Sequence, residues 1–121
     1  MKSVQALRGA TQVERDVPEL IHLAVSELLS EMMLGNSLTV DNFISVLFTA
    51  TPDLVSDFPA VGARSIGFGA IPLICASEID VPNAMPRVIR VLAHVETDQP
   101  RSAAKHIYLN GAVGLRQDLA Q

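Results

Sequence analysis

The sequence of 121 residues predicts one domain of the α+β or mixed α/β class. Segments with the two-residue period of strands are interleaved with segments of helical period. A long amphipathic segment separates the first two predicted strands and so acts as a crossover helix. No repeat, low-complexity tract or long linker divides residues 1–121. We expect a mixed sheet of about five strands packed with one long and one short helix.

The first half of the chain contains a strand, the long helix and a second strand. Residues 4–11 alternate as a strand. Asp16 is the predicted N-cap of the helix, with a glutamate three residues later, and Gly35 ends it. Residues 43–49 form the second predicted strand. The apolar stripe of the helix consists of Leu20, Ile21, Ala24, Val25, Leu28 and Met32.

The second half of the chain contains the short helix and three more strands. A turn at residues 51–53 leads to a helix that starts near residues 57–59 and runs to about Ile66, where Gly67 stops it. Strands are predicted for residues 71–76 and 88–95. A short edge strand is expected at residues 106–109.

Composition excludes several kinds of partner. With a net charge of −4, a pI of about 5.2 and few aromatic residues, the chain has no basic stripe for nucleic acid. No apolar stretch reaches the length of a membrane span, and no signal-peptide core is visible. A mean hydropathy of +0.32 is high for so small a chain, which favours apolar subunit interfaces. A single cysteine, Cys75, is compatible with the reducing cytoplasm.

We expect no metal and no cofactor. His22, His94 and His106 are scattered, without ligand spacing to Cys75 or to a carboxylate. The glycines of Gly67-Phe68-Gly69 precede a strand rather than a helix, so they form no phosphate loop. Cys75 itself is interpreted as a small buried apolar residue rather than a nucleophile.

Arg90 lies in the middle of the predicted strand 88–95, on the face opposite Ile89 and Val91. Arginine does not lose its proton, so this side chain needs an anion. A structural pair with one of the 13 carboxylates is one interpretation. A small anionic ligand is the other, because seven of the nine cationic residues are arginine and several lie in apolar or Gly/Ala surroundings. Those arginines are Arg8, Arg64, Arg90 and Arg116.

Glu78 follows the predicted strand 71–76 and adds an acceptor to these donors. It could be solvated or could neutralise an arginine. An acceptor near several cations is also what a ligand with carboxylates and a hydroxyl would require.

Eight short blocks of the sequence together resemble one family, the monofunctional, trimeric pseudo-α/β-barrel class of chorismate mutase found in bacteria. They appear in the family's order and spacing and cover almost the whole chain. The blocks are Arg8-Gly9-Ala10-Thr11, Val13-Glu14-Arg15-Asp16, Ala50-Thr51-Pro52-Asp53-Leu54, Phe58-Pro59-Ala60, Cys75 with Glu78, Ile89-Arg90-Val91, His106-Ile107-Tyr108-Leu109 and Leu115-Arg116-Gln117-Asp118-Leu119.

The resemblance implies an enzyme that rearranges chorismate to prephenate for phenylalanine and tyrosine synthesis. It also implies a homotrimer with its active sites in clefts between subunits. Arg90 would face the ether oxygen, Arg8 and Tyr108 would bind the side-chain carboxylate, and Glu78 with Cys75 would address the ring hydroxyl. The same resemblance implies that the walls of the cleft are formed by Phe58, Ala60, Leu73, Ile74 and Leu115. Arg64 and Arg116 would lie at the mouth of the cleft, and Arg116 would belong to a flexible tail that begins at about residue 115.

The sequence departs from some relatives at two positions, Val61 and Ile74, where a lysine and a polar residue occur elsewhere in the family. Both changes make the expected cleft less polar. Two alternatives to a mutase remain: a non-catalytic trimeric binder of small anionic metabolites, and a trimer resembling reactive-imine deaminases.

Overall fold

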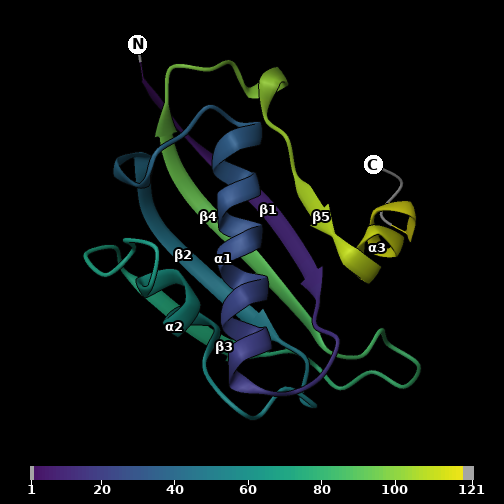
Figure 1. Cartoon of the computed structure of the whole chain (residues 1–121). Coiled ribbons are helices and arrows are strands. Elements are labelled where there is room, and N and C mark those ends of the chain that lie inside the picture. The colour runs from purple at the N-terminus through teal and green to yellow at the C-terminus, as the bar shows by residue number, and fades with distance from the viewer. Residues whose placement is uncertain (1, 119–121) are drawn as a thin grey trace.

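The computed structural model describes residues 2–118, and for residues 116–118 it describes the backbone alone. Its elements follow one another in the predicted order (Figure 1). The strands are β1 (Ser3–Gln12), β2 (Phe43–Ala50), β3 (Leu73–Ser77), β4 (Val88–Thr97) and β5 (Ile107–Leu109), and the α-helices are α1 (Pro18–Gly35), α2 (Pro59–Arg64) and α3 (Val113–Asp118).

The five strands form one mixed sheet in the order β3-β2-β4-β1-β5. The central pairs β1/β4 and β2/β4 are antiparallel, whereas the outer pairs β2/β3 and β1/β5 are parallel. Helix α1 provides the crossover between β1 and β2. The predicted class, the mixed sheet and the short edge strand are therefore confirmed.

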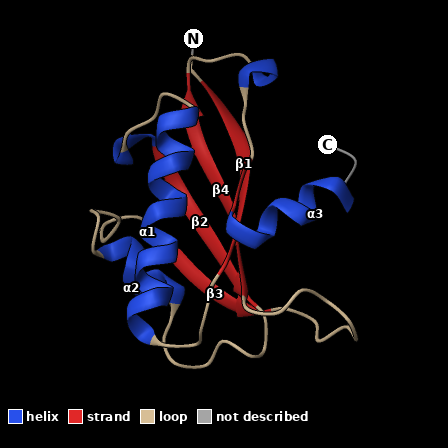
Figure 2. Ribbon diagram, turned by 45° about the vertical axis from the view of Figure 1, so that its right-hand side comes forward, coloured by secondary structure: helices blue, strands red, loops and turns tan. Residues whose placement is uncertain are grey.

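The helices α1 and α2 lie together on one face of the sheet (Figures 1 and 2). Leu28, Leu29 and Met32 of α1 are fully buried against sheet residues such as Phe48 and Ile89. In the described part of the chain, no helix covers the other face. We call this second surface the open face, and its side chains remain accessible in the single chain.

Alternation along β4 agrees with the sequence prediction. Ile89 and Val91 point into the core, whereas Arg90 and His94 lie on the open face. None of the helices in residues 2–118 combines the length and apolarity that crossing a membrane requires.

The predicted N-cap of α1 is wrong. Val17 is the N-cap residue, and no side chain caps this helix end. The Asp16 carboxylate instead accepts the backbone N–H groups of Val55 (3.1 Å) and Ser56 (3.1 Å), in the loop before α2. Hydrogen bonds from the Ser56 side chain first, and then from the backbone N–H groups of Val55 and Ser56, keep the pKa of Asp16 below its ordinary value. The carboxylate therefore ties two loops together.

The two short helices also differ from expectation. Helix α2 ends at Arg64, two residues before the predicted end, and Gly67 then adopts a φ of 100°, a conformation that glycine tolerates best. Helix α3 was not predicted; it includes residues 115–118, where the predicted tail begins, and residues 119–121 of that tail lie outside the described part.

Candidate active site

Strand pairing brings the predicted site residues of the open face into two adjacent rows. Arg90 of β4 lies opposite Ala10 of β1, and Ala10 lies opposite Tyr108 of β5. Arg8 lies opposite Leu92, one row away on the same face. Three residues that are far apart in the sequence, Arg8, Arg90 and Tyr108, are thereby gathered on one surface.

These rows line a cavity of about 290 Å³. Leu47 and Leu92 supply much of its apolar wall, and Arg8, Arg90 and Tyr108 supply polar groups. An apolar hollow with a few convergent polar groups is the usual form of a small-molecule site. Because two of those groups are guanidinium ions, the cavity is suited to an anionic ligand.

Arg90 has a carboxylate partner within its own chain. Its Nε lies 3.1 Å from Oε2 and 3.3 Å from Oε1 of Glu78. Thr49 Oγ1 donates a further hydrogen bond of 2.6 Å to Glu78 Oε2. Arg90 therefore has a structural pair, Glu78, and it also lines a cavity that could hold a small anionic ligand.

The pairing uses only one of the three guanidinium nitrogens of Arg90. Among the described side chains, the two terminal nitrogens have no hydrogen-bond partner. The side chain of Arg90 is 42% exposed and that of Glu78 is 17% exposed. Glu78 therefore fixes the guanidinium from one side while its terminal edge stays available to a ligand.

Other predicted site residues lie away from the cavity of their own chain. Phe58 is 67% exposed at the start of α2, and Arg64 is exposed at the end of this helix. Ile74, which is 65% exposed, lies on the open face opposite Leu47. Leu115 is half-buried in α3. The Arg116 side chain is outside the described part.

Two predicted wall residues, Leu73 and Ala60, and the predicted substrate-binding residue Cys75 pack on the helix-covered side of the sheet. Leu73 and Cys75 contact the core because they alternate with Ile74, and Cys75 is paired with Phe48. Ala60 is only 3% exposed within the core. A single chain therefore does not bring these side chains to Arg90.

Sequence reasoning missed Thr49 and the apolar residues Leu47 and Leu92 of the cavity. Strand alternation already placed Leu92 beside Arg90, so that signal was present. Thr49 lies opposite Arg90 through a β2/β4 register that the sequence does not reveal.

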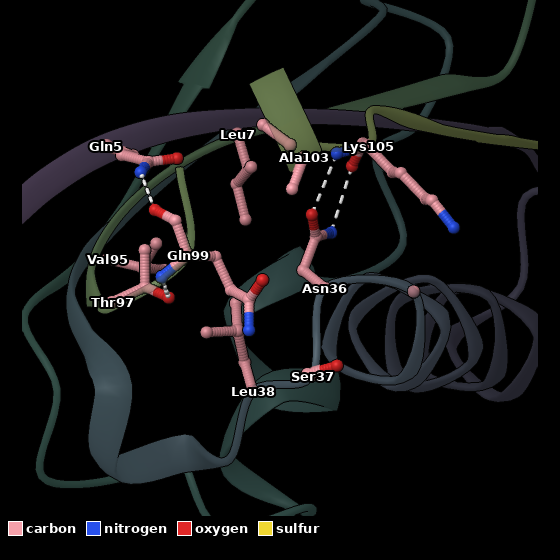
Figure 3. A pocket seen from close by; sticks show the side chains of 12 residues that line it. Gln5, Leu7, Asn36, Ser37, Leu38, Val95, Thr97, Gln99, Ala103 and Lys105 are labelled. Carbon is pink, nitrogen blue, oxygen red and sulfur yellow. Dashed lines mark hydrogen bonds between the residues drawn. The ribbon is translucent and has the colours of Figure 1, made fainter. Parts of the chain in front are cut away.

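A second cavity, of about 180 Å³, lies between the end of α1 and the far end of the sheet (Figure 3). Its polar groups are largely satisfied within the protein. Gln5 Nε2 donates to the Gln99 carbonyl (2.6 Å), and the Asn36 amide exchanges two hydrogen bonds with the Lys105 backbone. The Lys105 ammonium extends away from the other lining side chains (Figure 3). This cavity is therefore less suited to an anion than the one beside Arg90.

A histidine–carboxylate contact joins α1 to the loop before α2. His22 Nε2 lies 2.6 Å from Asp57 Oδ2, and Asp57 Oδ1 accepts the Phe58 N–H at 2.7 Å. The hydrogen bond from the Phe58 backbone, followed by that from His22, lowers the pKa of Asp57 below its ordinary value. Within residues 2–118, no group of three or more His, Cys, Asp or Glu side chains is arranged to hold a metal ion.

Fold and site together define a small mixed-sheet protein with an arginine-rich cavity for an anionic ligand. Comparison with known proteins then identifies the family. The model of the family "chorismate mutase type I" matches residues 4–119, and the chain belongs to this family.

Individual relatives agree with this assignment. The chain is 49% identical over 117 residues to "Chorismate mutase AroH" of Thermus thermophilus, which covers 96% of each chain. It is 37% identical over 118 residues to the protein of the same name from Bacillus subtilis (strain 168), covering 97% of this chain and 93% of the relative. The solved structure "Chorismate mutase from Clostridium thermocellum Cth-682" superposes with a TM-score of 0.89 at 44% identity, covering 91% of this chain and 98% of that one.

Proposed function

We propose that the cavity beside Arg90 is part of the active site in which this chorismate mutase converts chorismate to prephenate, a step towards phenylalanine and tyrosine. In this intramolecular Claisen rearrangement the ether C–O bond breaks as a new C–C bond forms. No proton is transferred and no nucleophile attacks. The protein must therefore hold the compact conformer of the substrate and stabilise the charge that develops on the ether oxygen.

Arg90 carries this proposal. Its Nε is held by Glu78, while its terminal nitrogens lack a partner among the described side chains and belong to a residue that lines the cavity. A fixed, permanently charged donor is what a developing oxyanion requires, because little reorganisation is then needed during the reaction. We propose that the terminal nitrogens of Arg90 bind the ether oxygen and a carboxylate of chorismate.

The neighbouring polar groups fit the rest of the substrate. Arg8 and Tyr108 line the same cavity and would bind the side-chain carboxylate. Glu78 Oε1 accepts only the longer of the two hydrogen bonds from Arg90 Nε, at 3.3 Å. It can therefore also accept a hydrogen bond from the ring hydroxyl of the substrate. These roles give each polar group of chorismate a partner.

A homotrimer would complete the cleft. Exposed apolar side chains occur at the start of α2, on β3 and in the loop after β3, namely Phe58, Ile74 and Ile79. In a single chain they expose an apolar surface that subunit association would bury. We propose that this region, with Arg64, faces the Arg90 cavity of a neighbouring subunit, where Leu73 and Ala60 would contribute to the wall and Cys75, with Glu78, would address the ring hydroxyl. Arg116 and Leu115 would act at the mouth.

The biosynthetic role and the unpaired thiol of Cys75 support a location in the cytoplasm.

The first experiment measures the loss of chorismate ultraviolet absorbance with purified protein, together with light scattering. We expect turnover and a particle of about 39 kDa, three times the chain mass of 13.0 kDa. Binding of chorismate without absorbance loss would instead support the non-catalytic binder. A monomer that turns over chorismate at micromolar concentration would contradict the shared cleft.

A further inference from the structure

We propose that Thr49 is a positioning residue for the rearrangement. Its hydroxyl fixes the Glu78 carboxylate, and that carboxylate in turn fixes the Arg90 guanidinium. The inference rests on the role proposed above for Arg90, and it adds a residue that acts on the reaction through two others.

The register of three strands places Thr49 for this task. Thr49 of β2 lies opposite Arg90 of β4 on one side and opposite Ala76 of β3 on the other. The chain of β3 ends at Ser77, and Glu78 follows directly. Thr49 is therefore the residue of the central sheet that faces both members of the ion pair.

The contact itself has the geometry of a strong hydrogen bond. Thr49 Oγ1 lies 2.6 Å from Glu78 Oε2, within the short range typical of a hydroxyl that donates to a carboxylate. The same Oε2 is the closer acceptor of Arg90 Nε, at 3.1 Å. Because threonine is branched at Cβ and lies in a strand, its rotamer is restricted and the hydroxyl is directed.

Among the described side chains, the Glu78 carboxylate has two hydrogen-bond partners, Thr49 and Arg90. Glu78 begins the loop 78–87, whose residues Ile79 and Val81 are exposed, and its N–H donates to the Ala50 carbonyl at 2.9 Å. That bond fixes its backbone but leaves the carboxylate free to rotate. Arg90 in turn has Glu78 as its only hydrogen-bond partner among the described side chains. The direction of the guanidinium thus depends on Glu78, and that of Glu78 on Thr49.

The test compares Thr49→Val, which removes the hydroxyl but keeps the shape, with Thr49→Ser, which keeps the hydroxyl. We expect Thr49→Val to lower the turnover number about tenfold, because one hydrogen bond to a charged group is lost. The Michaelis constant should change by less than about twofold, since ground-state binding is retained. Thr49→Ser should restore turnover to within about threefold of the parent, as its hydroxyl can donate the same bond.

Two controls separate positioning from a merely structural role. Ser45→Ala removes another β2 hydroxyl, one that contacts His94 Nδ1 at 3.4 Å, and should leave turnover unchanged. Thr49→Val should remain folded, because valine and threonine both suit strands, and thermal unfolding checks that any lost turnover does not reflect lost structure. In a Glu78→Ala background, which has no acceptor for the Thr49 hydroxyl, adding Thr49→Val should lower turnover by less than about twofold, because the two residues act through one interaction.

The outcomes are distinguishable from failure of the proposed site. If Arg90→Ala keeps normal turnover, the active-site assignment is wrong. If Arg90→Ala is inactive but Thr49→Val behaves like the parent, only the positioning role is wrong. An increased Michaelis constant with unchanged turnover in Thr49→Val would also overturn it, since Thr49 would then bind substrate directly. The positioning role would also be overturned if Thr49→Val lowered turnover equally in the parent and in the Glu78→Ala background.

Discussion

Replacement of Arg90 by lysine separates the two roles that the structure gives this residue. Lysine can still pair with Glu78, but it offers a point charge instead of a planar fork with two further nitrogens at its edge. Because Arg90 is 42% exposed, its ion pair contributes at most about 1 kcal/mol to folding. Loss of one preorganised donor at a developing oxyanion costs a factor of about 10² to 10³ in turnover. The catalytic effect therefore exceeds the stability effect.

The assay follows chorismate absorbance at saturating substrate, with thermal unfolding and light scattering on the same samples. We expect Arg90→Lys to remain folded and assembled, with turnover reduced at least about a hundredfold. Arg101→Lys, on an exposed arginine in the segment Arg101–Ala103, is the matched control and should keep parental turnover. Near-normal turnover of Arg90→Lys, or activity lost only through dissociation, would refute the reasoning and leave Arg90 as a structural pair.

Three further predictions concern pH and packing. Turnover should be nearly constant from neutrality to mild alkali, because arginine does not titrate there and no general base acts; a steep bell-shaped profile would contradict this. Gly62→Ala should lower stability by about 1–3 kcal/mol in denaturant titrations, because its Cβ would lie 2.8 Å from the His22 carbonyl oxygen; an unchanged midpoint would show that α2 can shift at no cost. Asp57 has a pKa below its ordinary 3.8, so its contribution to stability is present above that value and is lost as pH falls through the folded-state pKa. Asp57→Asn should flatten this acid-side decline in melting temperature, and an unchanged decline would assign it to other carboxylates.

Much of the fold could be predicted because periodicity is a local property of the chain. Alternation in residues 88–95 correctly assigned Arg90 to the face opposite Ile89. The capping pattern at Asp16 was equally local, yet the N-cap that it predicted was wrong. Its carboxylate accepts N–H groups about forty positions away, at Val55 and Ser56, and only the tertiary structure brings those donors near.

The partner of Arg90 could not be selected from sequence for the same reason. Any of 13 carboxylates was available, and the choice of Glu78 depends on how β2, β3 and β4 are aligned. A one-residue slip of β2 would turn Thr49 to the core and remove its hydroxyl from Glu78. Register is set by packing across the whole sheet, so the site becomes visible only with the fold.

The position of β3 explains how Leu73, Ile74 and Cys75 could all serve one cleft. Three consecutive side chains in a strand cannot point to the same face, and here only Ile74 lies on the open face. However, β3 is an edge strand of the described sheet, so one of its sides is not paired with another strand. A neighbouring subunit that packs along this edge could contact Ile74 on the open face and the accessible parts of Leu73 and Cys75, which are half-buried. The proposed roles of these three residues therefore require a cleft built around the β3 edge, as a site shared between subunits would provide.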